Sequence, residues 1–93
     1  MIISFKSKET EKIFKREYSK KLPQNIQKLA YRKLILIDGS TDVEDLKTPP
    51  GNKLEKLKGN RKEQFSIRIN DQWRICFSFE NSNAKNVEIV DYH

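Results

Sequence analysis

The chain ends on three side chains that can bond, stack and exchange protons: Asp91, Tyr92 and His93. His93 is the only histidine, and imidazole is the one side chain whose unperturbed pKa, about 6.5, lies near neutrality. The three follow a strand-like run, residues 87–90, without a spacer. We therefore expect acid–base chemistry at a strand end. The alternative, favoured by terminal position alone, is a solvated tail.

Two arginines occupy matching positions in neighbouring strand-like runs. Apolar and polar residues alternate over 65–69 and 73–79, so each run has one apolar face. A three-residue loop, 70–72, keeps the two apolar faces together. The same register opposes Arg68 and Arg74 on the polar face, where an anionic ligand would relieve their repulsion.

The alternation of side chains between the two sheet faces also predicts how the final strand pairs. If the apolar positions of 73–79 pair with those of 87–90, Arg74 lies opposite Tyr92 and next to His93. Such a group could clamp a phosphate, stack a base and transfer a proton. The alternative is that Arg74 pairs with an acidic residue of that strand and Tyr92 only covers the sheet edge.

One carboxylate, Glu55, stands among basic residues. Its neighbours are five bases, Lys53, Lys56, Lys58, Arg61 and Lys62. Their charge favours the ionised form of Glu55, which suits a general base. An ordinary surface ion pair is the competing interpretation.

The charge distribution points to a polyanionic partner. The net charge is +6, and eight basic residues face only three acidic ones between Lys47 and Arg74. Such asymmetry favours nucleic acid, although a lysine-rich solubilising surface would give the same count. One cysteine and one histidine provide neither a disulfide nor a zinc-ligand set. No metal or cofactor is expected, and the lone Cys76 fits a reducing cytoplasm.

Two classes of segment are not expected. No apolar run approaches the roughly 18 residues of a membrane span. The first five residues lack the basic and apolar regions of a signal peptide. We therefore expect a cytoplasmic protein without membrane contact.

The first half of the chain is predicted to be mainly helical. Residues 1–5 suit a strand, and Ser7 can cap a helix that carries Ile13, Phe14 and Tyr18 on one side. A second helix begins near Pro23, and its apolar residues follow the helical period. These are Ile26, Leu29, Ala30, Leu34 and Ile37, with Gly39 as the expected C-terminal cap and Thr41 as the cap of one further turn.

The second half is predicted to be sheet, beginning after the turn Pro49–Asn52. The helices are the obvious cover for its apolar face. The fold class is therefore α+β, in the order β-α-α-β-β-β, with two N-terminal helices on a mostly antiparallel sheet and one domain, 1–93.

Four segments together resemble a known family. They are Pro49–Glu55, Leu57–Arg61, Ser66–Phe77 with its Trp-Arg-Ile, and Val87–His93. In combination they are similar to the HigB branch of the RelE/ParE toxin superfamily, also called plasmid maintenance killer proteins. The resemblance spans nearly the whole chain and implies the RelE-like fold.

The resemblance implies a bacterial toxin that cleaves messenger RNA on the translating ribosome without a metal. The substrate's 2′-hydroxyl would attack the adjacent phosphate, leaving a 2′,3′-cyclic phosphate and a 5′-hydroxyl. It also implies a HigA-like helix-turn-helix antitoxin, which neutralises the toxin and binds operator DNA in complex with it. The ribosomal A site and mRNA would be the other partners.

The resemblance also assigns roles to matching residues. Arg74 and Lys58 would stabilise charge on the phosphate, and His93 would be the acid, with Tyr92 and Asp91 beside it. Glu55 would be the base, although a characterised relative type has histidine there. The surrounding cations would contact RNA phosphates: Lys53, Lys56, Arg61, Lys62 and Arg68.

Two other functions fit the same fold. A ParE-like toxin would poison DNA gyrase by binding, but that branch generally lacks the terminal Asp-Tyr-His. A non-catalytic RNA- or ribosome-binding domain would explain the +6 charge but would leave His93 without a task.

Overall fold

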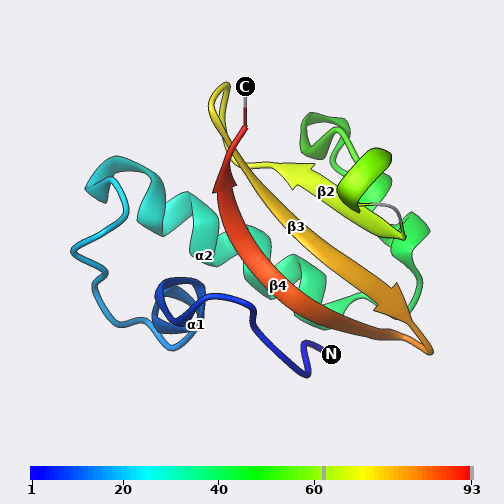
Figure 1. Cartoon of the computed structure of the whole chain (residues 1–93), viewed down its shortest axis with the longest axis horizontal. Helices are drawn as coiled ribbons and strands as arrows, with labels where there is room; N and C mark the ends of the chain where they lie inside the picture. The colour runs from blue at the N-terminus through cyan, green and yellow to red at the C-terminus, as the bar shows by residue number, and fades with distance from the viewer. Residues whose placement is uncertain (62, 93) are drawn as a thin grey trace.

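Two helices pack against a four-stranded antiparallel sheet in the computed structural model, which describes residues 1–61 and 63–92 (Figure 1). The helices are α1 (Lys8–Phe14) and α2 (Gln24–Gly39). The strands lie in the order β1 (Glu55–Lys56), β2 (Gln64–Arg68), β3 (Trp73–Glu80) and β4 (Asn83–Asp91). Short 3₁₀ helices cover Val43–Lys47 (η1), Pro50–Asn52 (η2) and Gly59–Arg61 (η3). Among the described residues no helix is long and apolar enough to cross a membrane.

The predicted α+β architecture, with two helices on an antiparallel sheet, is confirmed, but the element order is α-α-β-β-β-β. The expected N-terminal strand is wrong, because residues 1–5 make only isolated parallel bridges to β4, at Ile2 and Phe5. Side chains interrupt the ladder. The Ile2 N–H donates to Asp38 Oδ1 at 2.8 Å, and Ser4 Oγ accepts from the Asn86 N–H at 2.9 Å. The additional strand is β1, whose two residues pair with Ser66 and Phe65 of β2.

The helix ends differ from the sequence prediction. Ser7 caps α1 as predicted, but α1 ends at Phe14, and Tyr18 lies beyond it with 60% of its surface exposed. The backbone turns at Arg16, whose φ of 64° is left-handed and ends the helix. In α2, Gly39 is the last helical residue rather than a left-handed cap.

Two further helical details are corrected. Leu29 is 37% exposed, whereas the other predicted apolar positions of α2 are buried. Asp42, not Thr41, caps η1, because Asp42 and Asp45 form a reciprocal capping box.

The predicted register between β2 and β3 is confirmed. Ile67 pairs with Ile75 and Arg68 with Arg74. The Ile69 N–H donates to the Trp73 carbonyl at 2.8 Å across the loop. Burial of one apolar face decides this pairing, because a shift by one residue would expose it.

The predicted register between β3 and β4 is wrong by two residues. Arg74 lies opposite Val90, not Tyr92. The expected long loop is instead a tight turn at Asn81 and Ser82, both with positive φ. The register then shifts by one between Cys76 and Ser78. A two-residue displacement keeps the same face, so Arg74 and Tyr92 still lie on one side of the sheet.

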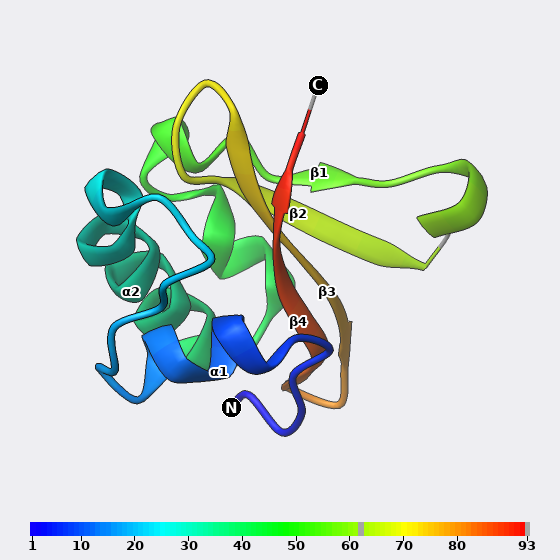
Figure 2. The same cartoon turned by 60° about the vertical axis from the view of Figure 1, so that its left-hand side comes forward.

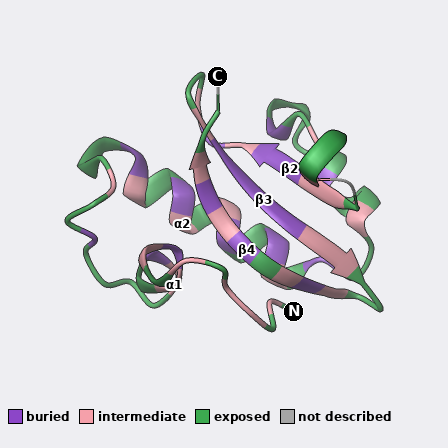
Figure 3. Cartoon of the chain, viewed as in Figure 1, coloured by how far each residue is buried: buried purple, intermediate pink, exposed green. Residues whose placement is uncertain are grey.

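The core lies between the helices and one face of the sheet (Figure 3). Its fully buried large side chains come from both layers: Leu34, Ile37, Ile67, Ile75, Phe77 and Val87. The opposite face was expected to meet water, yet Ser66, Arg74 and Cys76 on it are buried as well. Residues 53–61 cover it, since they supply contacts to Arg74 and to Glu88.

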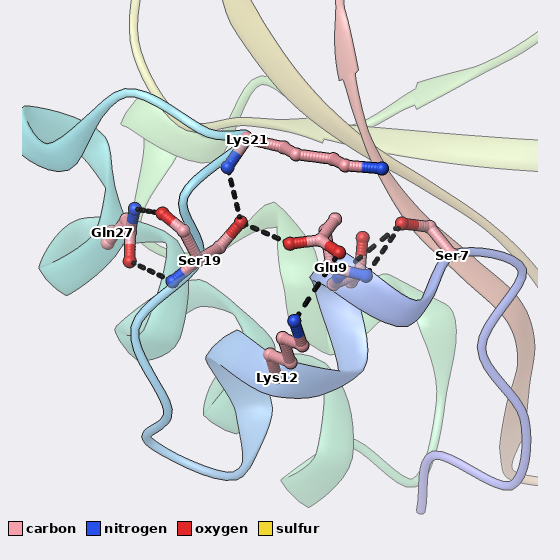
Figure 4. Close-up of polar contacts among 7 residues, drawn as sticks. Ser7, Glu9, Lys12, Ser19, Lys21 and Gln27 are labelled. Carbon is pink, nitrogen blue, oxygen red and sulfur yellow. Dashed lines mark hydrogen bonds and ion pairs between the residues drawn. The ribbon is translucent and has the colours of Figure 1, made fainter.

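A polar cluster fastens the connection between α1 and α2 (Figure 4). The buried Ser19 donates its hydroxyl to Glu9 Oε1 at 2.5 Å and accepts from the Lys21 N–H. Its backbone N–H and carbonyl both bond the side-chain amide of Gln27, at 3.1 and 2.8 Å. Because every one of these groups is paired, the connection is held against both helices.

We expect this cluster to make stability depend on acidic pH. The hydrogen bond from Ser19, with attraction from Lys12 opposing partial burial, lowers the pKa of Glu9 below 4.5. Because this pKa is lower in the folded state, the ionised carboxylate stabilises the fold at pH values above 4.5. The contribution is lost as the pH falls through the folded-state pKa of Glu9. Glu9→Gln should therefore lower the urea midpoint more at pH 7 than at pH 3. An equal loss at both pH values would contradict this linkage, and Glu11→Gln serves as the exposed control.

Candidate active site

Arg74 is the centre of the site, and its guanidinium is almost entirely buried. The residue is 6% exposed, and the hydrogen bonds and ion pair of the group come from β1, β2 and the turn before β1. Nε donates to Ser66 Oγ at 2.8 Å, and Nη2 donates to the carbonyls of Ser66 and Lys53. Lys53 can present its carbonyl because its backbone is left-handed, with φ 45°. The guanidinium is therefore fixed in one orientation before any ligand binds.

Glu55 and Tyr92 complete the surroundings of Arg74. Glu55 Oε1 lies 3.3 Å from Arg74 Nη1, and the Glu55 side chain is 50% exposed. The Tyr92 ring, 5.3 Å from Arg74 Cζ, stacks over the guanidinium as a cation–π contact. The predicted meeting of Arg74 and Tyr92 is thus confirmed despite the wrong register. The charge of Arg74 is thus paired with the half-exposed carboxylate of Glu55.

The end of β4 is tied to the loop after β2. The Tyr92 N–H donates to the Gln72 carbonyl at 2.7 Å, and Gln72 Nε2 donates to Asp91 Oδ2 at 3.1 Å. These bonds position Tyr92 above Arg74. His93 and Lys62, both predicted site residues, lie outside the described residues.

Arg61 and Glu88 form a second ion pair over the same face. Arg61 Nη1 lies 2.8 Å from Glu88 Oε1 and 3.1 Å from Gln64 Oε1. The bond to Glu88 raises the pKa of Arg61 above its ordinary value. Cys76 lies on the same face as this ion pair. Burial raises the pKa of its thiol, so the thiol is held neutral.

The remaining predicted cations lie around this centre rather than in it. Lys53, Lys56 and Lys58 are exposed, so they can reach a long polyanion. Arg68 is opposite Arg74 but forms an ion pair with Asp71. The repulsion expected between the two arginines is therefore relieved by carboxylates of the chain itself.

Two polar residues of this region were missed by sequence reasoning. Ser66 holds Arg74, and only its place on the same strand face as the arginine hinted at this contact. Lys33 comes from α2, donates to Asn52 Oδ1 and lies near Arg68. Burial, followed by repulsion from Arg68, lowers its pKa. No periodicity signal places Lys33 there, because helix packing alone brings it to the sheet.

The arrangement joins a fixed guanidinium, a half-exposed carboxylate and an aromatic ring. A fixed guanidinium stabilises negative charge that develops on a phosphate. The carboxylate can accept a proton, and the ring can stack on a base. Together these groups are suited to bind a nucleic-acid phosphodiester and to promote its cleavage.

Solved structures of other proteins share the helix-and-sheet architecture of this chain. YoeB in the YoeB–YefM complex from Staphylococcus aureus superposes with a TM-score of 0.63 at 23% identity, covering 100% of this chain and 95% of that one. A second structure, of the heterotetrameric complex, gives a TM-score of 0.62. The fold of this chain is thus that of the protein matched in these YoeB–YefM complexes.

Sequence comparison narrows the class. Residues 3–93 match the family described as RelE-like toxin of type II toxin-antitoxin system HigB. Toxin HigB-1 of Vibrio cholerae is 37% identical over 87 residues, covering 92% of each chain. Endoribonuclease HigB of Proteus vulgaris is 35% identical over 94 residues, covering both chains fully. The chain belongs to the HigB-like toxin family.

Proposed function

We propose that this toxin cleaves messenger RNA on the translating ribosome of the bacterial cytoplasm, with residues 1–93 acting as one catalytic domain. The family identifies the chain as an endoribonuclease toxin, in agreement with the relative named Endoribonuclease HigB. The observation that carries the finer proposal is the buried Arg74 guanidinium, held between Glu55 and Tyr92.

In the proposed reaction the scissile phosphate replaces Glu55 on Arg74. The guanidinium is fixed by Ser66 and Lys53, whereas the Glu55 side chain is half exposed and free to turn away. The released carboxylate then takes the proton of the 2′-hydroxyl. The 2′-oxygen attacks the adjacent phosphorus, and the 5′-oxygen leaves. The products are a 2′,3′-cyclic phosphate and a 5′-hydroxyl, and in this scheme side chains of the protein carry out every step without a metal or cofactor.

The other residues divide into two groups by role. Lys58 assists Arg74 in stabilising the phosphorane charge, and His93 protonates the leaving oxygen. Tyr92 stacks on the substrate or relays a proton, with Asp91 beside it. The cations Lys53, Lys56, Arg61, Lys62 and Arg68 contact the phosphates of mRNA in the ribosomal A site. The neutralising partner in this proposal is a HigA-like helix-turn-helix antitoxin, through which the complex reaches operator DNA.

Mapping RNA 5′ ends after induced expression tests this function. Cleavage on the ribosome predicts 5′-hydroxyl ends that recur at one position within codons. Ends without any reading-frame period would contradict A-site cleavage. DNA damage without new RNA ends would instead support a ParE-like gyrase inhibitor, the second function considered.

Glu55→Gln tests the general base. We expect the cleavage rate on programmed ribosomes to fall about 100-fold, the usual effect of losing a positioned base. Ribosome binding should be unchanged, because the glutamine keeps the shape of the side chain. Glu80→Gln, the same substitution at an exposed carboxylate of β3 that pairs with Lys85 and has no role in the site, is the matched control. A native cleavage rate in Glu55→Gln would remove this residue from the mechanism.

Ser66→Ala tests the positioning of Arg74. Loss of the hydroxyl leaves a buried guanidinium N–H unpaired, which costs about 1–3 kcal/mol in stability. A displaced guanidinium should also lower kcat roughly 10-fold with little change in KM. Ser66→Thr, which keeps the hydroxyl, should recover part of the rate. Equal rates for the native chain and the alanine variant would show that Ser66 is only a packing residue.

A further inference from the structure

A hollow of about 560 Å³ lies between the end of α1, its connection to α2 and the first half of α2. Its apolar lining comes from Ile13, Tyr18 and Tyr31. Tyr18 is 60% exposed, which is high for a tyrosine with no place in the candidate active site. A concave apolar surface of this size is typical of a binding site.

The hollow is ringed by positive charge. Arg16, Lys28 and Arg32 line it, against the single acidic residue Glu17. Lys28 and Arg32 are four residues apart on α2 and lie on one side of that helix. The rim therefore favours a ligand with carboxylates at its edges and an apolar group in the middle.

The surface continues along α2 as an exposed apolar strip. Leu29, Ile35 and Leu36 are exposed by 37%, 43% and 39%. Exposed apolar residues grouped in this way mark protein interfaces more often than nucleic-acid sites. Tyr31 supports the same choice, because the Arg16 guanidinium lies 4.7 Å from its ring centroid and covers one face. That face is then closed to a stacking base.

The hollow is built before any partner arrives. Ser19, bonded to Glu9 and Gln27, fastens the connection that forms one wall (Figure 4). The cation–π contact between Arg16 and Tyr31 stabilises a second wall of the hollow. Preformed walls reduce the entropy lost on binding.

The hollow is separate from the candidate active site. The α1–α2 connection and β1, which carries Glu55, lie on opposite sides of the molecule (Figure 2). The two sites share no residue, so a ligand in the hollow leaves Arg74 and Tyr92 uncovered.

We propose that this hollow is the docking site for an acidic segment of the antitoxin, which inserts a large apolar side chain between Tyr18 and Tyr31. Carboxylates of that segment pair with Lys28 and Arg32 at the rim. The proposal rests on the toxin–antitoxin function above and adds the surface on which the partner sits.

Charge reversal at the rim tests the proposal. The double variant Lys28→Glu/Arg32→Glu is titrated calorimetrically with the purified antitoxin encoded beside the toxin gene. We expect the Kd to rise about 100-fold or more, because charge reversal sets like charges against the carboxylates of the partner. The control Lys47→Glu/Lys85→Glu makes the same charge change at two surface lysines away from the hollow, which pair with Glu44 and Glu80, and should keep the native Kd within about threefold. Tyr18→Ala, an exposed position, gives a second test without a charge change.

Growth assays separate docking from catalysis. The rim variant should still inhibit growth alone but should no longer be neutralised by the antitoxin. A native Kd in both Lys28→Glu/Arg32→Glu and Tyr18→Ala would overturn the proposal. Lost toxicity with a native Kd would likewise overturn it and assign the hollow to RNA. A raised Kd in a toxin whose native form cleaves no RNA would support docking while refuting the proposed activity.

Discussion

Arg74→Ala should lower the rate of ribosome-dependent mRNA cleavage by at least about 100-fold. Removing one fixed donor to a developing oxyanion usually costs this much. Arg74 is the most strongly preorganised charge of the site, because Ser66, Lys53 and Glu55 all contact it. Arg74→Lys should lose nearly as much, since an ammonium group cannot reproduce the planar fork of the guanidinium. Single-turnover rates on programmed ribosomes measure both variants.

The experiment must show that Arg74→Ala still folds, because the substitution leaves Glu55 and Ser66 without their contact to Arg74. Arg68→Ala is the matched variant. It removes an arginine directly opposite Arg74 in the register, yet its guanidinium pairs with Asp71 at the exposed end of β2. We expect Arg68→Ala to weaken RNA binding severalfold and to leave the chemical step intact. Near-native cleavage by folded Arg74→Ala would refute charge stabilisation by this residue.

The sequence predicted the fold where burial alone decides structure. Alternation in β2 and β3 specified their register, since the opposite parity would expose Ile67 and Ile75 to water. It failed where local backbone geometry decides. Asn81, Ser82 and Asn86 all adopt positive φ without being glycine. These residues shorten the hairpin loop and insert the irregularity opposite Cys76–Ser78, and neither feature has a periodic signal.

The site was predicted only where the alternation of a strand places a residue on the right face. Arg74 and Tyr92 were placed together through an incorrect register, and the error of two residues preserved the face. Glu55 was expected either as a base or as a surface ion pair, and the structure makes it the ion-pair partner of Arg74 itself. Ser66 and Lys33 depend on contacts between elements distant in sequence. Such contacts follow from packing rather than from pattern, so the sequence alone did not identify them.

His93→Gln should also reduce cleavage by about 100-fold or more, because glutamine cannot donate a proton to the leaving 5′-oxygen. His93 lies outside the described residues, so this prediction rests on its chemistry and on its place next to Tyr92, whose ring covers Arg74. Because a general acid must be protonated to act, the native rate should decline as the pH rises through the titration of the imidazole. His93→Gln should lack that decline within the same pH range.

Tyr92→Phe is the matched control for the histidine, since it keeps the ring over Arg74 and removes only the hydroxyl. If Tyr92 acts by stacking, Tyr92→Phe should retain most of the activity, whereas His93→Gln should not. A large loss in both would place Tyr92 in the proton transfer. Combining His93→Gln with Arg74→Ala removes the acid and the charge stabilisation together. Full growth inhibition by that double variant would refute the ribonuclease mechanism, because the variant lacks both the proposed acid and the main proposed charge stabiliser.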